Sequence, residues 1–216
     1  MNTPVSHEST SSAYLGISLG TNFYSIRRIE SYFCWSKIHY DRFSVLIGDW
    51  IYAYTHGFFH SSSHRASIGT ALAMGDAAAA MCEKAACSSK RPINVIRWND
   101  LRGMHNYKLL LPELFNEYKI NREFRADCNS QIILNLGERV SLADTDPHRT
   151  FHPLVCYLLH EICGLVVISE YTEYSTEVYP GKDLSIMTNL YGGRYHGLLK
   201  YMPNQRNRAF VSLIME

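Results

Sequence analysis

The run AYLGIS (residues 13–18) is short and apolar, and GTN (20–22) then breaks the pattern. A short apolar run that is bounded by turn-forming residues predicts a buried β-strand, here ending at Ser18. In the segment that follows, 22–38, apolar residues recur every three or four positions, which is typical of an amphipathic helix. Asn22 is the expected N-cap of that helix.

The same alternation continues along the chain. FSVLIGD (43–49) predicts a second strand, and the alanine-rich segment 66–87 predicts a long helix. Strands that alternate with helices predict an α/β fold with a mostly parallel sheet, whose ligands bind beyond the carboxyl ends of the strands, where Ser18 and Asp49 fall. The remaining expectations are a short helix or loop at 51–59, a strand with a polar second half at 93–101, two helices in 104–136 with Pro112 in the first turn of the second, a polar connector at 139–150, a helix at 151–169, a strand with a turn at Pro180 and Gly181 in 175–187, and a last strand at 210–215.

The composition indicates one compact domain in the cytoplasm. The chain has 216 residues, of which 46% are hydrophobic, enough for a sizeable core. Residues 1–12 are expected to be a disordered tail without the features of a signal peptide, and 13–216 a single domain. No window approaches the roughly 18 uninterrupted apolar residues of a membrane span. The six cysteines include no CxxC pair and are expected to be reduced thiols.

The charge distribution allows a nucleic-acid partner only through a local patch. The net charge is +1 with histidine neutral, so the chain has no global basic excess. Basic residues nevertheless outnumber acidic ones between 90 and 125, which fits a local phosphate-binding face, although each residue taken singly is more simply a solvated surface residue. These residues are Lys90, Arg91, Arg97, Arg102, Lys108, Lys119, Arg122 and Arg125.

Ser18 lies in the pattern Gly16-x-Ser18-x-Gly20. This is the nucleophile elbow of α/β-hydrolases, which requires a strand before the serine and a helix after it. Both are expected here, but no aspartate and histidine follow in an obvious triad order. The alternative interpretation is a tight turn that contains a small residue.

Tyr157 and Glu161 lie four residues apart in an apolar segment. On a helix they share a face, and a carboxylate in apolar surroundings is costly to bury without a partner. Such a glutamate can bind an amine or exchange a proton. The equally weighted alternative is a structural hydrogen bond or a partly exposed helix face. His160, between them, is expected to face elsewhere.

Two further features of the sequence bear on a site. Tyr179 precedes Pro180 at an expected strand end, where a tyrosine hydroxyl can enter a site, although most tyrosines only pack. His56, His60 and His64 recur every four residues and would share one face of a helix. Because no carboxylate accompanies them at ligand spacing, no metal site is expected.

Together, the Gly-x-Ser turn, the Tyr157/Glu161 helix and the Tyr179-Pro180 pair resemble the cyclodipeptide synthases in residues, order and spacing. The resemblance spans residues 14 to about 215. One branch of that family has asparagine three residues after the serine and histidine after the second tyrosine. Thr21 and Pro180 occupy those positions here, so the chain resembles the other branch, which has a non-asparagine residue and Tyr-Pro.

The resemblance implies a single Rossmann-like domain, similar to the catalytic domain of the class I aminoacyl-tRNA synthetases for tyrosine and tryptophan. It implies an aminoacyltransferase that joins two aminoacyl groups from their tRNAs into a 2,5-diketopiperazine, without ATP or metal. Ser18 would carry the first aminoacyl group as an ester, Glu161 would bind its ammonium and move protons, and Tyr157 and Tyr179 would hold the same moiety.

The resemblance also implies a substrate pocket and a tRNA surface. The expected pocket residues are Gly16, Thr21 and Pro180, together with Tyr52 and Tyr54, which are expected there because they follow the end of the second strand. The basic residues between 90 and 125 would meet tRNA phosphates. DNA and a membrane are not expected as partners. The alternative functions are a serine hydrolase acting through Ser18 and a tRNA-binding relative of a synthetase domain that lacks catalysis.

Overall fold

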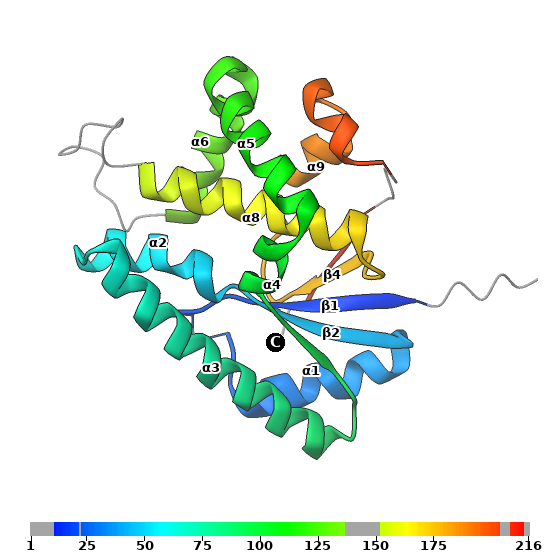
Figure 1. Cartoon of the computed structure of the whole chain (residues 1–216). Coiled ribbons are helices and arrows are strands. Elements are labelled where there is room, and N and C mark those ends of the chain that lie inside the picture. The colour runs from blue at the N-terminus through cyan, green and yellow to red at the C-terminus, as the bar shows by residue number, and fades with distance from the viewer. Residues whose placement is uncertain (1–10, 22, 137–151, 204–207, 214–216) are drawn as a thin grey trace, which may run out of the picture.

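A sheet of five parallel strands organises the chain, in the order β3-β2-β1-β4-β5 (Figure 1). The computed structural model describes residues 11–21, 23–136, 152–203 and 208–213. The strands are β1 (Ser12–Ile17), β2 (Arg42–Ile47), β3 (Asn94–Arg97), β4 (Thr176–Tyr179) and β5 (Ala209–Ser212).

Helices cover both faces of this sheet. In Figure 1, α1 and α3 lie below the strands, and α4, α5 and α8 lie above them. Each face has its own hydrophobic core, so the molecule has three layers. The helices are α1 (Ile26–His39), α2 (Asp49–His60), α3 (His64–Ser89), α4 (Trp98–Gly103), α5 (His105–Ile120), α6 (Arg122–Leu136), α8 (His152–Tyr171), α9 (Ser185–Tyr191) and the 3₁₀ helix η3 (His196–Tyr201).

The alternation of side chains along β1 and β4 decides which residues face α8. Leu15 and Val178 belong to the core under α1 and α3, whereas Tyr14 belongs to the core with α8. Successive residues of a strand point to opposite faces of the sheet, so Gly16 lies on the same face as Tyr14. On β4, Glu177 and Tyr179 point to the face opposite that of Val178. The α8 side of the sheet therefore receives the polar residues of both strand ends.

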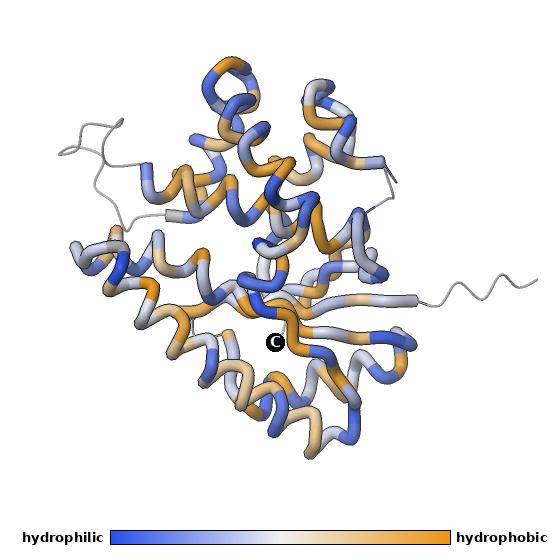
Figure 2. Tube along the Cα trace, viewed as in Figure 1, coloured by the Kyte–Doolittle hydropathy of each residue, from blue (hydrophilic) through white to orange (hydrophobic). Residues whose placement is uncertain are grey.

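Helix α8 is the most enclosed helix of the upper layer. It has the length and mean hydropathy, 1.5, of a membrane-spanning helix, but 78% of that apolar segment is buried inside the domain, as in a core helix. Figure 2 shows apolar residues along its length. Any polar side chain of α8 that faces the sheet is consequently held away from bulk water.

Most of the expected elements are present, and two local expectations are wrong. The N-cap of α1 is Ser25, whose Oγ accepts a bond from the backbone N–H of Arg28 at 3.4 Å; Asn22 lies outside the described residues. Pro112 lies inside α5 rather than at the start of a second helix. The break falls at Asn121, whose side chain accepts bonds from the first N–H groups of α6 at 2.9 and 3.2 Å.

The other differences concern element bounds. The segment 51–59, expected to be a short helix or a loop, is part of α2. The segment 93–101 divides into β3 and α4. The connector 139–150 lies outside the described residues, as does most of the expected tail, and the described part of the last strand ends at Ser212.

Gly164 allows α8 to pack closely on α4. A Cβ atom at this position would lie 2.3 Å from Trp98 Cζ2. We expect Gly164→Ala to lower the free energy of unfolding by about 1–3 kcal/mol, because the buried indole must shift. Denaturant unfolding measures this change.

Gly69 provides the matched control. It also lies within a helix, α3, but an added Cβ would meet nothing within 4 Å. Gly69→Ala should leave stability unchanged or raise it by up to about 1 kcal/mol, since alanine is the better helix former. Equal effects of the two substitutions would contradict this account of the α4–α8 contact.

Candidate functional site

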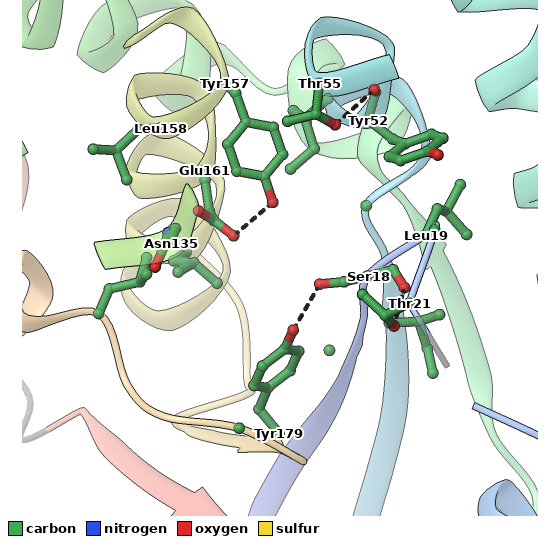
Figure 3. Close-up of a pocket in the computed structure, with 18 of the residues that line it drawn as sticks. Ser18, Leu19, Thr21, Tyr52, Thr55, Asn135, Tyr157, Leu158, Glu161 and Tyr179 are labelled. Carbon is green, nitrogen blue, oxygen red and sulfur yellow. Dashed lines mark hydrogen bonds between the residues drawn. The ribbon is translucent and has the colours of Figure 1, made fainter. Parts of the chain in front are cut away.

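A cavity of about 610 Å³ opens at the carboxyl edge of the sheet, where α/β folds bind their ligands (Figure 3). Its wall combines apolar residues with a small group of polar ones. Its lining residues come mainly from β1 and the segment after it, from α2 and α8, and from β4 and the segment after it. Among them are Gly16, Ser18, Gly20, Thr21, Phe23, Tyr52, Thr55, Phe59, His60, Tyr157, Glu161, Glu177, Tyr179, Gly181, Lys182 and Asp183.

Ser18 faces Tyr179 across the end of the sheet. β1 and β4 are parallel neighbours in which Leu15 is paired with Val178, so their carboxyl ends meet. The Tyr179 hydroxyl donates a hydrogen bond of 3.0 Å to Ser18 Oγ (Figure 3). Burial raises the pKa of Tyr179, so the tyrosine remains a neutral donor.

The turn after Ser18 is fixed by local contacts. The Thr21 hydroxyl donates to the backbone oxygen of Ser18 at 3.2 Å. Gly20 has φ = +75°, and a Cβ there would lie 2.6 Å from the Tyr52 hydroxyl oxygen. Both the backbone conformation and the close tyrosine ring therefore require glycine at this position.

Tyr157 and Glu161 occupy the opposite wall, one turn apart on α8 (Figure 3). The Tyr157 hydroxyl donates to Glu161 Oε1 at 3.1 Å. The second oxygen, Oε2, is buried and has no hydrogen-bond partner among the residues that the structure describes. Burial raises the pKa of Glu161 to about 8, against the lowering effect of the Tyr157 hydrogen bond. Glu161 can therefore exchange a proton near neutral pH and has one oxygen free for a cationic donor.

Two charged residues to which the sequence patterns assigned no role lie at or next to the cavity wall. Glu177 lines the cavity, and its Oε2 accepts hydrogen bonds from Tyr14 and Arg208. Arg208 also binds Asp183. Glu177 could have been found from the alternation of β4, which places it on the same face as Tyr179. The sequence gives no comparable signal for Arg208, because Arg208 lies far along the chain from its partners Glu177 and Asp183.

Among the expected pocket residues, Gly16, Thr21 and Tyr52 line the cavity, but Tyr54 does not. Its hydroxyl is hydrogen-bonded to His160 Nε2 at 3.2 Å in the core between α2 and α8. The expectation for Tyr54 is wrong because 51–59 is helical, and residues two apart on a helix point in different directions.

Pro180 is likewise not part of the cavity wall, although the adjacent Gly181 is. His160 faces away from the site, as expected: it is buried beside Tyr54 and Tyr107, with its Nδ1 2.6 Å from the Tyr107 hydroxyl.

The structure does not bring the eight basic residues together on one surface. The α3–β3 connection, which carries Lys90 and Arg91, and the α5–α6 turn, which carries Lys119 and Arg122, lie at opposite ends of the molecule (Figure 1). Several of the eight already have intramolecular partners: Arg91 with the Tyr40 carbonyl, Arg97 with Asp49 and Asp76, Arg102 over the Trp50 ring, and Arg125 with backbone carbonyls of α5. Lys90, Lys108, Lys119 and Arg122 are exposed.

The histidine series does not form one helix face. His56 and His60 lie on α2, with ring centroids 4.5 Å apart, whereas His64 begins α3. Within the described ranges, no group of three or more histidine, cysteine, aspartate or glutamate residues is arranged to hold a metal ion.

Comparisons with known proteins agree on one family. The family model for cyclodipeptide synthase matches residues 3–207. A search of curated proteins by sequence finds no significant match.

Solved structures show the same fold. A CDPS from Fluoribacter dumoffii has a TM-score of 0.76 at 22% identity, covering 90% of this chain and 85% of that chain. A CDPS from Staphylococcus haemolyticus has a TM-score of 0.75 at 14% identity, covering 96% and 92%. A Mycobacterium tuberculosis protein, described as demonstrating that cyclodipeptide synthetases are related to type I tRNA synthetases, has a TM-score of 0.62 at 16% identity, covering 96% and 83%.

The buried carboxyl group of Glu161 makes stability depend on pH. Its pKa rises from 4.5 to about 8 on folding, so the folded protein holds a proton that the unfolded chain releases between these values. Below about pH 4.5 Glu161 is protonated in both the folded and the unfolded state and does not lower the free energy of unfolding. This free energy then decreases as the pH rises through about 8. We expect Glu161→Gln to reduce this loss by up to about 1.4 kcal/mol per pH unit.

Urea unfolding between pH 5 and 8.5 measures the effect. Glu177 has a raised pKa from burial as well and keeps a residual slope of the same sign in the variant. Glu83→Gln, at an exposed position of α3, is the control and should follow the wild type. Identical slopes for Glu161→Gln and the wild type would show that Glu161 does not take up a proton on folding.

Proposed function

The chain belongs to the cyclodipeptide synthase family, and from this premise we propose that it forms its product through an aminoacyl ester on Ser18. The family uses aminoacyl-tRNAs as substrates and needs no ATP, and the chain is an aminoacyltransferase of this kind. The observation that carries the proposal is the placement of Ser18 and Tyr179 on one wall of the cavity and of Tyr157 and Glu161 on the other.

In the first step, Ser18 Oγ attacks the ester carbonyl of an aminoacyl-tRNA. One carbon–oxygen bond forms and another breaks, and the serine proton passes to the departing ribose oxygen of the tRNA. The exchange of one ester for another is nearly even in energy, so a strong general base is less necessary than in amide hydrolysis. The Tyr179 hydroxyl, which donates to Ser18 Oγ, holds the nucleophile in place.

Glu161 is the proposed contact for the α-ammonium of the serine-bound aminoacyl group. Its buried Oε2 offers an acceptor without a partner among the described residues, and Tyr157 holds the other oxygen. Each amide bond forms when an amine that has lost a proton attacks an ester carbonyl and an alcohol departs. A carboxylate with a pKa near neutrality can accept that proton and pass it on.

The cavity also supplies proximity and protection from water. Holding an ester beside an amine gives the effective concentration needed for amide formation, in both the first and the ring-closing step. Apolar residues such as Ile51, Leu158 and Leu165 line the cavity and limit the water that could hydrolyse the acyl-enzyme. Ring closure on Ser18 releases the cyclic dipeptide and restores the serine hydroxyl.

Three finer assignments belong to this proposal. Thr21 and Pro180 favour the branch of the family without asparagine after the serine. The exposed residues Lys90, Lys108, Lys119 and Arg122 are candidate contacts for tRNA phosphates. A cytoplasmic location follows from the need for aminoacyl-tRNA.

A serine hydrolase is less well supported, because the hydrogen-bond partner of Ser18 Oγ is a tyrosine rather than a histidine.

The substitution Ser18→Ala tests the ester. Expression of the wild type in bacteria should release a diketopiperazine into the medium, detectable by mass spectrometry, and Ser18→Ala should abolish it. Ser31→Ala, at an exposed serine of α1, is the control and should leave the yield unchanged. Unchanged production by Ser18→Ala would rule out the acyl-enzyme, and trapping of an aminoacyl group on Ser18 would exclude a non-catalytic tRNA-binding role.

The substitution Tyr179→Phe tests the serine contact while keeping the ring. Loss of one neutral hydrogen bond of about 0.5–1.5 kcal/mol should slow acylation of Ser18 by about 2- to 13-fold. Rapid-quench measurement of the acyl-enzyme gives the rate. Tyr54→Phe is the matched control, because its hydroxyl faces the core, and an equal effect of the two substitutions would argue against a specific role for Tyr179.

A further inference from the structure

Arg208 joins the last strand to the candidate site. It lies immediately before β5 and is the first residue after the range that the family model matches. Its side chain is only 4% exposed and forms an ion pair with Glu177. It also binds both oxygens of Asp183, with two nitrogen–oxygen distances of 2.8 Å. One guanidinium therefore holds two carboxylates that line the cavity.

These two carboxylates stand on either side of Tyr179 in the chain. Glu177 lies two residues before it on the same strand face, and Asp183 lies four residues after it, beyond the turn at Gly181. A Cβ on Gly181 would lie 2.6 Å from Tyr179 Cε1, so this turn packs directly against the tyrosine ring. By tying both flanks together, Arg208 fixes the segment that aims the Tyr179 hydroxyl at Ser18.

Arg208 also balances charge in the cavity. The charge of Glu177 favours the protonated form of Glu161, and the charge of Arg208 favours its ionised form. Both charges act on Glu161 because the ion pair lies within electrostatic reach of it, and their effects oppose each other because the charges have opposite signs. The other titratable or charged groups around Glu161 are Tyr157 on α8, Tyr179 on β4, Lys182 and Asp183 after β4, and Tyr52 and His60 on α2 across the cavity.

We propose that Arg208 is a positioning residue of the reaction, which fixes Tyr179 against Ser18 and, by neutralising Glu177, keeps Glu161 able to hold the substrate ammonium. This inference rests on the roles of Ser18, Glu161 and Tyr179 proposed above. It assigns a function to a residue outside the range matched by the family model. A purely structural ion pair would support the fold without setting the pH dependence of product formation.

The experiment compares pH profiles of product formation. The two amino acids are first identified from the product of the wild type in culture, and the purified full chain is then assayed with the corresponding aminoacyl-tRNAs. Arg208→Gln should lower kcat by about 10- to 100-fold, with KM changed by less than about twofold, because the nucleophile and its partner lose alignment. The acidic limb of its pH profile should move to higher pH.

The sign of the shift should reverse in a second variant. Glu177→Gln removes the like charge and leaves Arg208 in place, so the acidic limb should move to lower pH. In the double variant Arg208→Gln/Glu177→Gln both charges are absent, and the limb should return close to its wild-type position. Arg208→Lys keeps the charge without the planar fork, so it should keep the limb and lower kcat.

Arg42→Gln is the matched control, because Arg42 and Glu173 form an ion pair on the exposed surface, and it should change neither kcat nor the profile. Lower activity of Arg208→Gln and Glu177→Gln without any shift of the limb would overturn the inference. If Arg208→Gln does not fold, the shift of the acidic limb to lower pH in Glu177→Gln and the absence of a shift in Arg208→Lys decide the question. No product from the wild type would instead contradict the proposed function.

Discussion

The parallel pairing of β1 with β4 is the constraint on which the site depends. The two strands are far apart in the sequence, and their pairing brings both carboxyl ends to one edge of the sheet. The twofold alternation along each strand then points Ser18 and Tyr179 to the α8 side. β1 is the central strand of the sheet and is paired on both sides, so the serine follows a strand that is held by two neighbours.

The second requirement is a carboxylate inside an otherwise apolar helix. Burying Glu161 opposes folding, and the single hydrogen bond from Tyr157 offsets only part of the cost. A fold selected for stability alone would place an apolar residue there. Glu161 lines the cavity, and its Oε2 is buried without a hydrogen-bond partner among the described residues, so this energetic cost supports the proposal that an ammonium binds to Glu161 during the reaction.

Asp49 and Glu161 differ in how the oxygens of their carboxylates are used. Asp49 also lies at the end of a strand, but its oxygens accept bonds from the backbone N–H groups of Trp50 and Trp98 and from the Arg97 guanidinium. Its acceptor capacity is used within the fold, where it joins α2 to β3 and α4. Glu161 has an oxygen left over, and that difference separates a helix-joining residue from one that can meet a substrate.

The sequence by itself determined the elements and the local pairs. Periodicity predicted the strands and the long apolar helix, and the four-residue spacing placed Tyr157 beside Glu161, because neighbours on one helix face are fixed by local geometry. The resemblance in ordered motifs led to the family, which the family model confirmed. The same local reasoning gave wrong positions for Tyr54, Pro112 and the histidine series, because a misplaced helix boundary redirects every side chain near it.

Only the tertiary structure decided how the strand ends meet and how charge is arranged beneath them. The contacts of Arg208 with Glu177 and Asp183 join β4, the turn after it and the start of β5, and no spacing in the sequence encodes them. The unpartnered oxygen of Glu161 is likewise a property of three-dimensional packing, since burial and hydrogen bonding are set by all neighbouring elements at once. The candidate residues Ser18, Tyr157, Glu161 and Tyr179 could be read from the chain, but their electrostatic setting depended on the fold.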